Sequence, residues 1–506
     1  MAVLRVVVIG GGPGGLSAAL ALKRRNPRWD VTVFERHRAQ STFGYGVGLR
    51  WSALDRLARA DPDCAEAVRE VSHPLTTQTL RRGDEAVSVT SAHGLGVSRS
   101  ALLSVLARHA AASGVRIRTG QAVSVAEVAD ADVVIAADGA GSRTREALAA
   151  RLGVTANTGD LLYLWCGARL PLDAMTLCLT RNDAGPLAAH VMPYGEGACT
   201  FQVDARANAV DRLGSVANTR IADDGLALAP LERQFAALLG GAGLRTKQTS
   251  WSPFSTVRCE RWSSGNVVLL GDAVHTAHYS VGSGTALAIE DALVLAEALS
   301  ESSSVAAAFA DYESTRKPYA ERLQRRAERS ERWWSTLDAR YDLPLHALLV
   351  SYLSRTGALR LAEIAQLDGP RLSDCLPSGI DGEVGAGSVA DWILGQPFIS
   401  NGASLPSRVY SRHSAQDHDN VLTLTVPPGP VADRWEQARL LADQGTTHIR
   451  LVGEGGREGL LDRLELAELL RARALVTIVA GGADAVEDLA LGVLCHRTDL
   501  VELTTS

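Results

Sequence analysis

The sequence predicts an α/β fold in which a doubly wound parallel sheet carries an inserted mixed β-sheet and is followed by a small C-terminal α/β domain. Three observations predict it. The apolar run Val6–Ile9 leads through a glycine-rich turn into a helical segment, as a buried parallel strand does. Residues 155–260 alternate apolar and polar side chains, as the strands of an antiparallel sheet do. Residues 396–506 contain three segments that each read as a helix followed by a strand.

The composition is that of a large soluble protein. The chain has 506 residues, of which 46% are apolar and 21% charged, and this favours two or three globular domains. The net charge of −6 is spread without blocks, so a nucleic-acid partner is not expected. Seven scattered cysteines without a CxxC pair predict neither a zinc site nor a disulfide scaffold. Because we find no signal-peptide pattern and no run of about 18 apolar residues, we expect a cytoplasmic protein with no membrane span and no metal.

The first 36 residues contain a dinucleotide-binding pattern. Gly10 allows a tight turn, Gly12 lets the backbone approach a pyrophosphate, and Gly15 lets the helix pack close to the strand. Glu35 ends the next strand about twenty residues later, where a carboxylate accepts hydrogen bonds from a ribose. A glycine turn without a ligand is the alternative, and this pattern does not separate FAD from NAD. The candidate cofactor-binding residues of this segment are Gly10, Gly12, Pro13, Gly14, Gly15, Glu35 and Arg36.

Three further segments point to a known family. Asp138, Gly139 and Arg145 lie in a DGxxSxxR pattern after a predicted strand. Gly271–Asp272 ends another predicted strand, and Arg99 stands at the start of a predicted helix. In their order along the chain after the glycine turn (Arg99, Asp138 to Arg145, Gly271–Asp272), they resemble the single-component (class A) FAD-dependent aromatic hydroxylases, the group that includes para-hydroxybenzoate hydroxylase. Taken alone, the first pattern could also be an Asp-Gly turn followed by a surface arginine.

The resemblance implies a Rossmann-type FAD-binding domain with an inserted substrate sheet, as in para-hydroxybenzoate hydroxylase. It implies FAD as the cofactor, NAD(P)H as the reductant and O2 as the co-substrate. Because the sequence has one GxGxxG unit, NAD(P)H would bind transiently on the FAD-binding domain. The further FAD-binding residues that the resemblance implies are Arg99, Val123, Asp138, Gly139, Arg145, Gly271, Asp272, Gly282, Gly284 and Thr285.

The stretch that follows Asp272 has an unusual composition, with histidines and glycines before a helix that we expect to begin near Thr285. Unpaired N–H groups give a helix start partial positive charge, and in the resembled family this end faces the flavin. Residues 277–285, AHYSVGSGT, resemble a narrower group: the salicyloyl-CoA and anthraniloyl-CoA hydroxylases and the violacein-pathway tryptophan-ring hydroxylase.

Candidate catalytic and substrate residues follow from this narrower resemblance. The catalytic candidates are His278, Tyr279 and His190, and a structural role is the alternative for the two histidines. For His275 we expect the structural role. The candidate substrate contacts are Tyr45, Arg50, Trp165, Trp251 and Phe254, for whose aromatic members core packing is the alternative.

The resemblance also implies domain boundaries. It covers residues 1 to about 370, with FAD-binding parts at about 1–155 and 260–345 and the substrate sheet at about 155–260. Residues 305–334 read as one long helix whose Arg and Glu side chains form a solvated face. Residues 396–506 resemble parts of an old yellow enzyme barrel, but a complete barrel needs roughly 250 residues. We therefore expect a degenerate, truncated barrel remnant without FMN.

The function that the resemblance implies is hydroxylation of an electron-rich amino- or hydroxy-aryl substrate, with NAD(P)H and O2, through a flavin C4a-hydroperoxide. The substrate would be an acyl thioester such as salicyloyl-CoA or anthraniloyl-CoA, or one held on a carrier protein. One alternative is a hydroxylase of an indole- or tryptophan-derived intermediate. A flavin halogenase is disfavoured because no WxWxIP-like segment is present, and a catalytically silent flavin-binding protein is the remaining alternative. The chain would act as a monomer or a homodimer.

Overall fold

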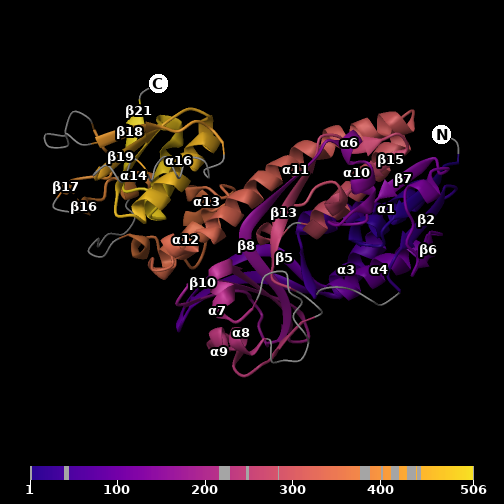
Figure 1. Cartoon of the computed structure of the whole chain (residues 1–506), viewed down its shortest axis with the longest axis horizontal. Coiled ribbons are helices and arrows are strands. Elements are labelled where there is room, and N and C mark those ends of the chain that lie inside the picture. Colours follow the sequence, from indigo (N-terminus) through magenta and orange to yellow (C-terminus); the bar gives the residue numbers. More distant parts are fainter. Residues whose placement is uncertain are drawn as a thin grey trace. The chain divides into compact units, whose positions relative to one another are not determined.

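The chain folds into two units (Figure 1). The first unit comprises Met1–Asp84 and Ser91–Ser335, and the second comprises Glu85–Thr90 and Thr336–Ser506. The computed structural model describes residues 3–38, 45–215, 228–246, 250–282, 284–376, 388–400, 403–411, 421–429, 440 and 446–504.

A six-stranded sheet carries the glycine turn of the first unit, with strand order β14-β15-β7-β1-β2-β6. Its inner strand β1 (Arg5–Ile9) pairs in parallel with β2 (Asp30–Glu35) on one side and with β7 (Val133–Ala136) on the other. The strand order therefore reverses beside β1, and ligands of doubly wound sheets bind at the carboxyl ends of strands at such a point. The other strands are β6 (Arg116–Thr119), β14 (Ser263–Ser264) and β15 (Val267–Leu269).

Helices α1 (Pro13–Arg25) and α10 (Gly284–Glu301) pack tightly against each other in this unit. Small residues allow the close approach, since a Cβ on Gly14 would lie 3.2 Å from the Ala288 side chain of α10. The predicted long helix is α11 (Val305–Ser335). The remaining α-helices are α2 (Trp51–Ala60), α3 (Pro62–Glu70), α4 (Arg99–Ala112), α5 (Arg143–Ala147), α6 (Ala149–Leu152), α7 (Ala207–Arg212), α8 (Ala229–Gln234), α9 (Ala236–Leu239), α12 (Leu345–Ser354), α13 (Leu361–Ala365), α14 (Val389–Leu394), α16 (Gly456–Arg471) and α17 (Val486–Leu494).

A nine-stranded mixed sheet contains the predicted inserted strands. Its order is β12-β8-β11-β10-β9-β4-β5-β3, and β13 pairs with β8 outside this path. Most neighbours are antiparallel, whereas β4 and β9 run in parallel. The predicted mixed sheet is confirmed, and six of its strands lie between β7 and β15 as expected, but β3, β4 and β5 precede β7, so the sheet is not formed by the insertion alone. The strands are β3 (Gly46–Leu49), β4 (Ser72–Arg82), β5 (Glu85–Ser98), β8 (Val154–Arg169), β9 (Met175–Asn182), β10 (Gly185–Gly195), β11 (Ala198–Arg206), β12 (Leu244–Arg245) and β13 (Ser252–Cys259).

The second unit contains a four-stranded parallel sheet whose strands follow chain order: β18 (Val421–Thr425), β19 (His448–Val452), β20 (Val476–Gly482) and β21 (Leu500–Thr504). Helices α16 and α17 connect the last three strands. Val409 forms an isolated parallel bridge to Val501 of β21, so a segment that precedes β18 in the chain lies beside the last strand. Residues 432–439 and 441–445, which belong to the first of the three predicted helix–strand segments, lie outside the described residues.

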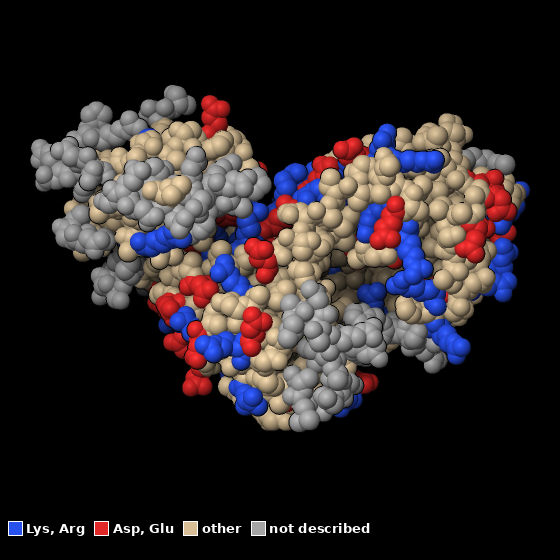
Figure 2. Space-filling view, viewed as in Figure 1, with Lys and Arg blue, Asp and Glu red and all other residues tan. Residues whose placement is uncertain are grey.

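All seven cysteines are buried and unbonded. Burial raises the pKa of their thiols, to about 12 for Cys64 and Cys166. Among the described residues, the helices are too short or too polar to cross a membrane. Acidic and basic side chains are interspersed on the face shown in Figure 2.

Candidate functional site

The glycine turn after β1 leaves an open space at the start of α1. Gly10 has a φ of +109°, and a Cβ there would lie 2.2 Å from the Ala137 carbonyl oxygen. A Cβ on Gly15 would lie 2.0 Å from the Gly10 carbonyl oxygen. In contrast, a Cβ on Gly12 would meet nothing within 4 Å. Gly10 and Gly15 are therefore required by the fold, whereas Gly12 borders free space beside an uncapped helix N-terminus, which attracts phosphate.

Glu35 stands at the end of β2, next to this turn. One carboxylate oxygen accepts a hydrogen bond from the Gly11 N–H (2.7 Å), and the other accepts one from the His37 N–H (2.8 Å). These two bonds fix the carboxylate while leaving lone pairs that could accept from a ribose diol. The neighbouring Arg36 is exposed, and Val123 is half-buried against the core of this domain.

The side chains of Asp138 and Arg145 both form hydrogen bonds with other residues of the protein. The Asp138 carboxylate accepts a hydrogen bond from the Ser142 hydroxyl (2.6 Å), and Arg145 Nη1 donates one to the Asp272 carbonyl oxygen (3.2 Å). Arg145 thereby joins the turn after β7 to the turn after β15. A Cβ on Gly139 would meet nothing within 4 Å, so the first of these turns also borders open space.

Asp272 and Arg99 bring two predicted segments together. Desolvation raises the pKa of the Asp272 carboxyl, although the charges of His275 and Arg99 oppose the shift. Burial lowers the pKa of the Arg99 guanidinium, and attraction by Asp272 and Glu35 opposes this. A Cβ on Gly284, the first residue of α10, would lie 3.8 Å from Asp272 Oδ1. Asp272 therefore lies beside the start of α10, and Arg99 is close enough to Asp272 and Glu35 for their charges to affect its pKa.

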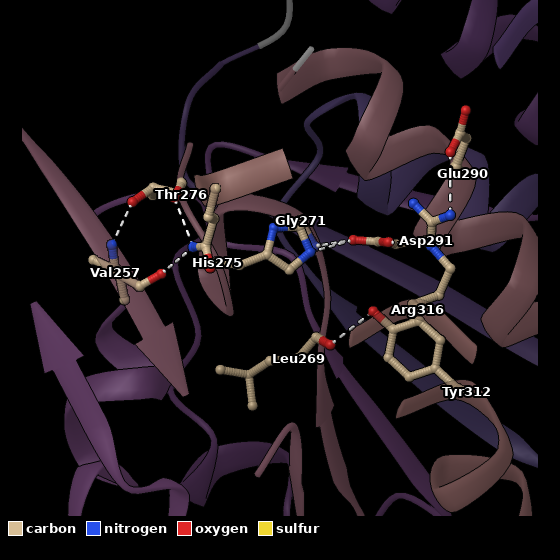
Figure 3. Close-up of polar contacts among 10 residues, drawn as sticks. Val257, Leu269, Gly271, His275, Thr276, Glu290, Asp291, Tyr312 and Arg316 are labelled. Carbon is tan, nitrogen blue, oxygen red and sulfur yellow. Dashed lines mark hydrogen bonds and ion pairs between the residues drawn. The ribbon is translucent and has the colours of Figure 1, made fainter. Parts of the chain in front are cut away.

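A buried ionic network anchors the Gly271–Asp272 turn to α10 and α11 (Figure 3). Asp291 of α10 accepts hydrogen bonds from the Gly271 N–H (3.1 Å), His275 Nε2 (2.8 Å) and Arg316 Nε (2.7 Å). Arg316 of α11 also pairs with Glu290 (3.1 Å). The histidine and arginine lower the pKa of the Asp291 carboxyl against the effect of its burial. His275 lies inside this network, as the structural role predicted for it requires, whereas the predicted solvated face of α11 is wrong at Arg316, which is buried.

The loop 277–282 lies between this turn and the mixed sheet. His278 is fully buried, and its Nδ1 is hydrogen-bonded to Ser280 Oγ (2.8 Å), which is in turn bonded to Ser330 Oγ of α11 (2.8 Å). Gly282 has a φ of +60°, and Arg50 Nη2 donates a hydrogen bond to the carbonyl oxygen of the preceding residue (3.0 Å). Arg50, which is one of the predicted substrate contacts, therefore also holds the 277–282 loop in place.

The side of the mixed sheet that the loop approaches is polar and aromatic. Tyr163 lies opposite Asp204 in the β8–β11 register, and His190 lies opposite Gln202 in the β10–β11 register. His190 Nε2 is 2.8 Å from Asp204 Oδ2, and the Tyr279 hydroxyl donates a hydrogen bond to Asp204 Oδ1. Burial and Asp204 raise the pKa of the Tyr279 phenol well above its usual range, so this hydroxyl stays protonated.

Aromatic rings surround this polar cluster. The Phe254 ring centroid lies 5.1 Å from that of His278 and 5.9 Å from that of Tyr279. Tyr163 lies 5.0 Å from Tyr279 and 6.5 Å from Phe254. Such tilted and edge-on contacts fix the ring orientations. Phe254 therefore joins two of the three catalytic candidates, and Tyr163 is an additional member that the sequence did not single out.

The other predicted substrate residues lie in different surroundings. Trp165 is opposite Gln202 on the polar face, and the Tyr45 hydroxyl donates a hydrogen bond to the Arg245 carbonyl oxygen (2.7 Å). Trp251 is only 1% exposed and packs in the core on the other face, with Phe201. For Trp251 the structure therefore favours the core-packing alternative.

Two acidic residues of this region were missed from sequence. Asp204 accepts hydrogen bonds from both His190 and Tyr279, and Glu331 of α11 has a buried Oε1 without a hydrogen-bond partner among the described residues. A signal for Asp204 exists, because Thr200, Gln202 and Asp204 alternate with apolar residues along β11 and thus share one face. Glu331 carries no such signal.

Glu331 makes the stability of the first unit depend on pH. Burial, and then repulsion by Glu328, raise the pKa of its carboxyl to about 7. Because the folded pKa exceeds the unfolded one, this contribution to stability is complete below about pH 4.3 and is lost as the pH rises through about 7. Glu331→Gln should therefore raise the free energy of unfolding by about 2 kcal/mol at pH 8.5, and by much less at pH 5.5.

Urea denaturation of the purified protein at the two pH values measures this effect. Glu146→Gln is the control, since Glu146 is exposed on α5 and its replacement should change the unfolding free energy by less than about 0.5 kcal/mol. Equal effects of Glu331→Gln at both pH values would contradict the assignment.

Comparison with known proteins places these features in context. Residues 3–327 match the family described as FAD binding domain. The chain is 39% identical over 337 residues to salicyloyl-CoA 5-hydroxylase of a Streptomyces species, across 65% of each chain. It is 35% identical over 362 residues to 3-hydroxy-4-methyl-anthranilyl-(aryl-carrier protein) 5-monooxygenase of Streptosporangium sibiricum, across 72% of this chain and 97% of that one. The tetrameric form of 2-methyl-3-hydroxypyridine-5-carboxylic acid oxygenase superimposes with a TM-score of 0.54 at 22% identity, over 70% of this chain and 96% of that one.

Proposed function

We propose that this chain, which belongs to the FAD-binding-domain family and is an FAD-dependent aromatic monooxygenase, hydroxylates an amino- or hydroxy-aryl group that is carried as a thioester. The observation that carries this proposal is the polar and aromatic face of the mixed sheet. Tyr279 and Phe254 contact each other there, beside the FAD-binding turns. Two relatives support the substrate class, because one is named for an aryl-CoA thioester and the other for an aryl group on a carrier protein.

The residues of the first domain fit FAD. The open space in front of Gly12 and Gly139 would accommodate the pyrophosphate, and the fixed Glu35 carboxylate would accept hydrogen bonds from a ribose. Asp272, which lies beside the start of α10, would accept hydrogen bonds from the remaining chain of the cofactor. Bound FAD supplies the redox chemistry that activates O2 for ring hydroxylation.

The α10 N-terminus would supply electrostatic stabilisation at the flavin ring. Gly284 opens an 18-residue helix that has no acidic residue in its own first turn, and its N-terminus carries partial positive charge next to Asp272. Negative charge that develops on the ring would be stabilised there. The ionic network of Asp291 and Arg316 keeps this helix and the Asp272 turn in fixed relative positions.

The substrate ring would lie against Tyr163, Phe254 and Tyr279, whose orientations their mutual contacts fix. Asp204 would act as a positioning residue, because it fixes the Tyr279 hydroxyl and the His190 imidazole together. His278 would bind or relay a proton, since its Nδ1 connects through Ser280 to Ser330 by two hydrogen bonds of 2.8 Å. Exclusion of water by these buried side chains would protect the reacting ring.

The further elements of the proposal are NAD(P)H as a transiently bound reductant, O2 as the co-substrate, and a monomer or homodimer in the cytoplasm. We also propose that the C-terminal domain is a barrel remnant with no redox role. Its four parallel strands in chain order, together with the Val409–Val501 bridge, support this origin.

A substrate screen tests the proposed function. The FAD-loaded enzyme would be given salicyloyl-CoA, anthraniloyl-CoA, their free acids, indole or tryptophan, with NADH or NADPH in parallel. We expect an aryl thioester to accelerate NAD(P)H oxidation and to yield a product heavier by one oxygen atom, while the free acids have little effect. Stimulation by indoles but not by thioesters would overturn the proposed substrate class, and chloride-dependent halogenation would overturn the reaction.

A further inference from the structure

One face of α11 contacts both parts of the candidate catalytic cluster. Ser330 Oγ is hydrogen-bonded to Ser280 Oγ of the 277–282 loop (2.8 Å), and the ring centroid of Trp334 lies 4.6 Å from that of His190 on β10. Ser330 and Trp334 are four residues apart, so they share one face of the helix. Helix α11 also packs against β8 and β11 of the mixed sheet. This helix therefore forms a wall of the candidate site.

Glu331 follows Ser330 on α11, and its carboxyl group lies against β8. A Cβ on Gly159 of β8 would lie only 1.7 Å from Glu331 Oε1, so the carboxyl group fills the space that a larger residue at position 159 would need. Oε1 is buried and has no hydrogen-bond partner among the described residues. An ionised carboxylate in this place would lack the donors that stabilise it. The geometry therefore favours a neutral carboxyl group.

Charged groups on α11, β8 and β11 act on Glu331. Burial, and then repulsion by Glu328 one turn earlier on α11, raise the pKa of its carboxyl to about 7. Arg332 of the same helix lowers this pKa, whereas Asp204 of β11 and Asp160 of β8 raise it further. Glu331 is therefore neutral below about pH 7 and negatively charged above it.

Asp204 connects this charge to the candidate catalytic residues. Its Oδ1 accepts a hydrogen bond from the Tyr279 hydroxyl, and its Oδ2 is 2.8 Å from His190 Nε2. The negative charge of an ionised Glu331 repels that of Asp204. This repulsion is reduced when Asp204 interacts more strongly with its hydrogen-bond donors. A change of charge on α11 should therefore alter the hydrogen bond that holds Tyr279.

We propose that Glu331 is a positioning residue of the hydroxylation site, which acts through Asp204 on the orientation of the Tyr279 hydroxyl group. The inference rests on the proposed function, because it takes Tyr279 and Asp204 as parts of the site that holds the aryl ring. The neutral carboxyl group maintains the described arrangement, and its ionisation disturbs it. Because hydroxylation depends on the exact placement of the ring, the disturbance should lower kcat/KM.

A titration without substrate tests the link to Tyr279. The FAD-loaded full chain would be labelled with 13C at the tyrosine Cζ atoms, whose chemical shift responds to hydrogen bonding of the hydroxyl, and Tyr279→Phe would assign the resonance. Burial and Asp204 raise the pKa of the Tyr279 phenol well above its usual range, so it does not itself ionise between about pH 5.5 and 8.5. We expect the wild-type resonance to shift with a midpoint near pH 7, and the uncharged variant Glu331→Gln to lack this transition.

Glu328→Gln is the matched control on the same helix. It also removes a negative charge but keeps the titrating carboxyl, so the transition should persist, with a lower midpoint because the repulsion by Glu328 is lost. A wild-type Tyr279 resonance without a transition would overturn the proposal. An equal transition in the wild-type protein and in Glu331→Gln would also overturn it, because the transition would then arise from another group, such as His190 or His278.

The effect on hydroxylation would be measured with salicyloyl-CoA as the probe. Between about pH 6.5 and 8.5, kcat/KM of the wild-type protein should fall at least about fivefold more than that of Glu331→Gln, whose side chain stays neutral. Equal falls in the two proteins would contradict a role of Glu331 in hydroxylation. Absence of turnover in both would count against the proposed substrate class instead, and the Tyr279 resonance would still decide whether Glu331 acts on the site.

Discussion

Gly12→Ala is expected to give a folded protein that does not retain FAD. The added methyl group has open space within the protein, so folding should be unaffected, but it would occupy the position that the pyrophosphate needs. We expect FAD affinity to fall about 100-fold, which corresponds to about 2.7 kcal/mol. The ratio of flavin to protein absorbance after gel filtration, and titration of the apoprotein with FAD, measure this loss.

Gly243→Ala is the matched control, because the added Cβ would make an ordinary 3.6 Å contact with Glu232, away from the nucleotide-binding strands. Gly10→Ala offers the opposite comparison, since its Cβ would clash with the backbone and should impair folding itself. A Gly12→Ala protein that stays fully yellow would disprove the placement of FAD against this turn.

Arg316→Met should be the most destabilising change in the buried ionic network. It removes the arginine that pairs with two buried carboxylates, Asp291 and Glu290, and removal of one member of such a network costs about 3–5 kcal/mol. The loss of the positive charge should also raise the pKa of Asp291, which Arg316 helps to lower. Urea denaturation followed by flavin fluorescence measures the change, which should be smaller at low pH, where the carboxylates are protonated.

Arg25→Met provides the comparison. Arg25 pairs with Glu297 and Glu301 on the surface, and such pairs contribute less than about 1 kcal/mol. If Arg316→Met and Arg25→Met destabilise the protein equally, the network around Asp291 does not anchor the α10–α11 region.

The parts of the site that were predictable from sequence are local ones. The glycine turn, Glu35 and the Gly271–Asp272 turn each depend on residues within one strand–turn–helix unit, so spacing along the chain reveals them. Asp204 depends on the register of β8, β10 and β11 and on the approach of Tyr279 from a distant loop, and both are fixed only when the sheet assembles.

The α10–α11 pair shows the same limit. Arg316 belongs to a helix rich in Arg and Glu, and such a sequence is typical of a solvent-exposed face. Arg316 is buried because α11 packs against α10, whose Asp291 and Glu290 are its ion-pair partners. The sequence of either helix alone does not indicate the ion-pair partner on the other helix. The Arg- and Glu-rich composition of α11 therefore predicted an exposed position for Arg316.

The enclosure of every thiol has a practical consequence. Alkylation and oxidation require an accessible thiolate, and burial both hides the seven sulfur atoms and keeps them protonated. The native protein should therefore be inert to maleimides and to hydrogen peroxide. A single cysteine engineered onto its surface would then be the one reactive position for a fluorescent or spin label, with no need to remove the natural ones.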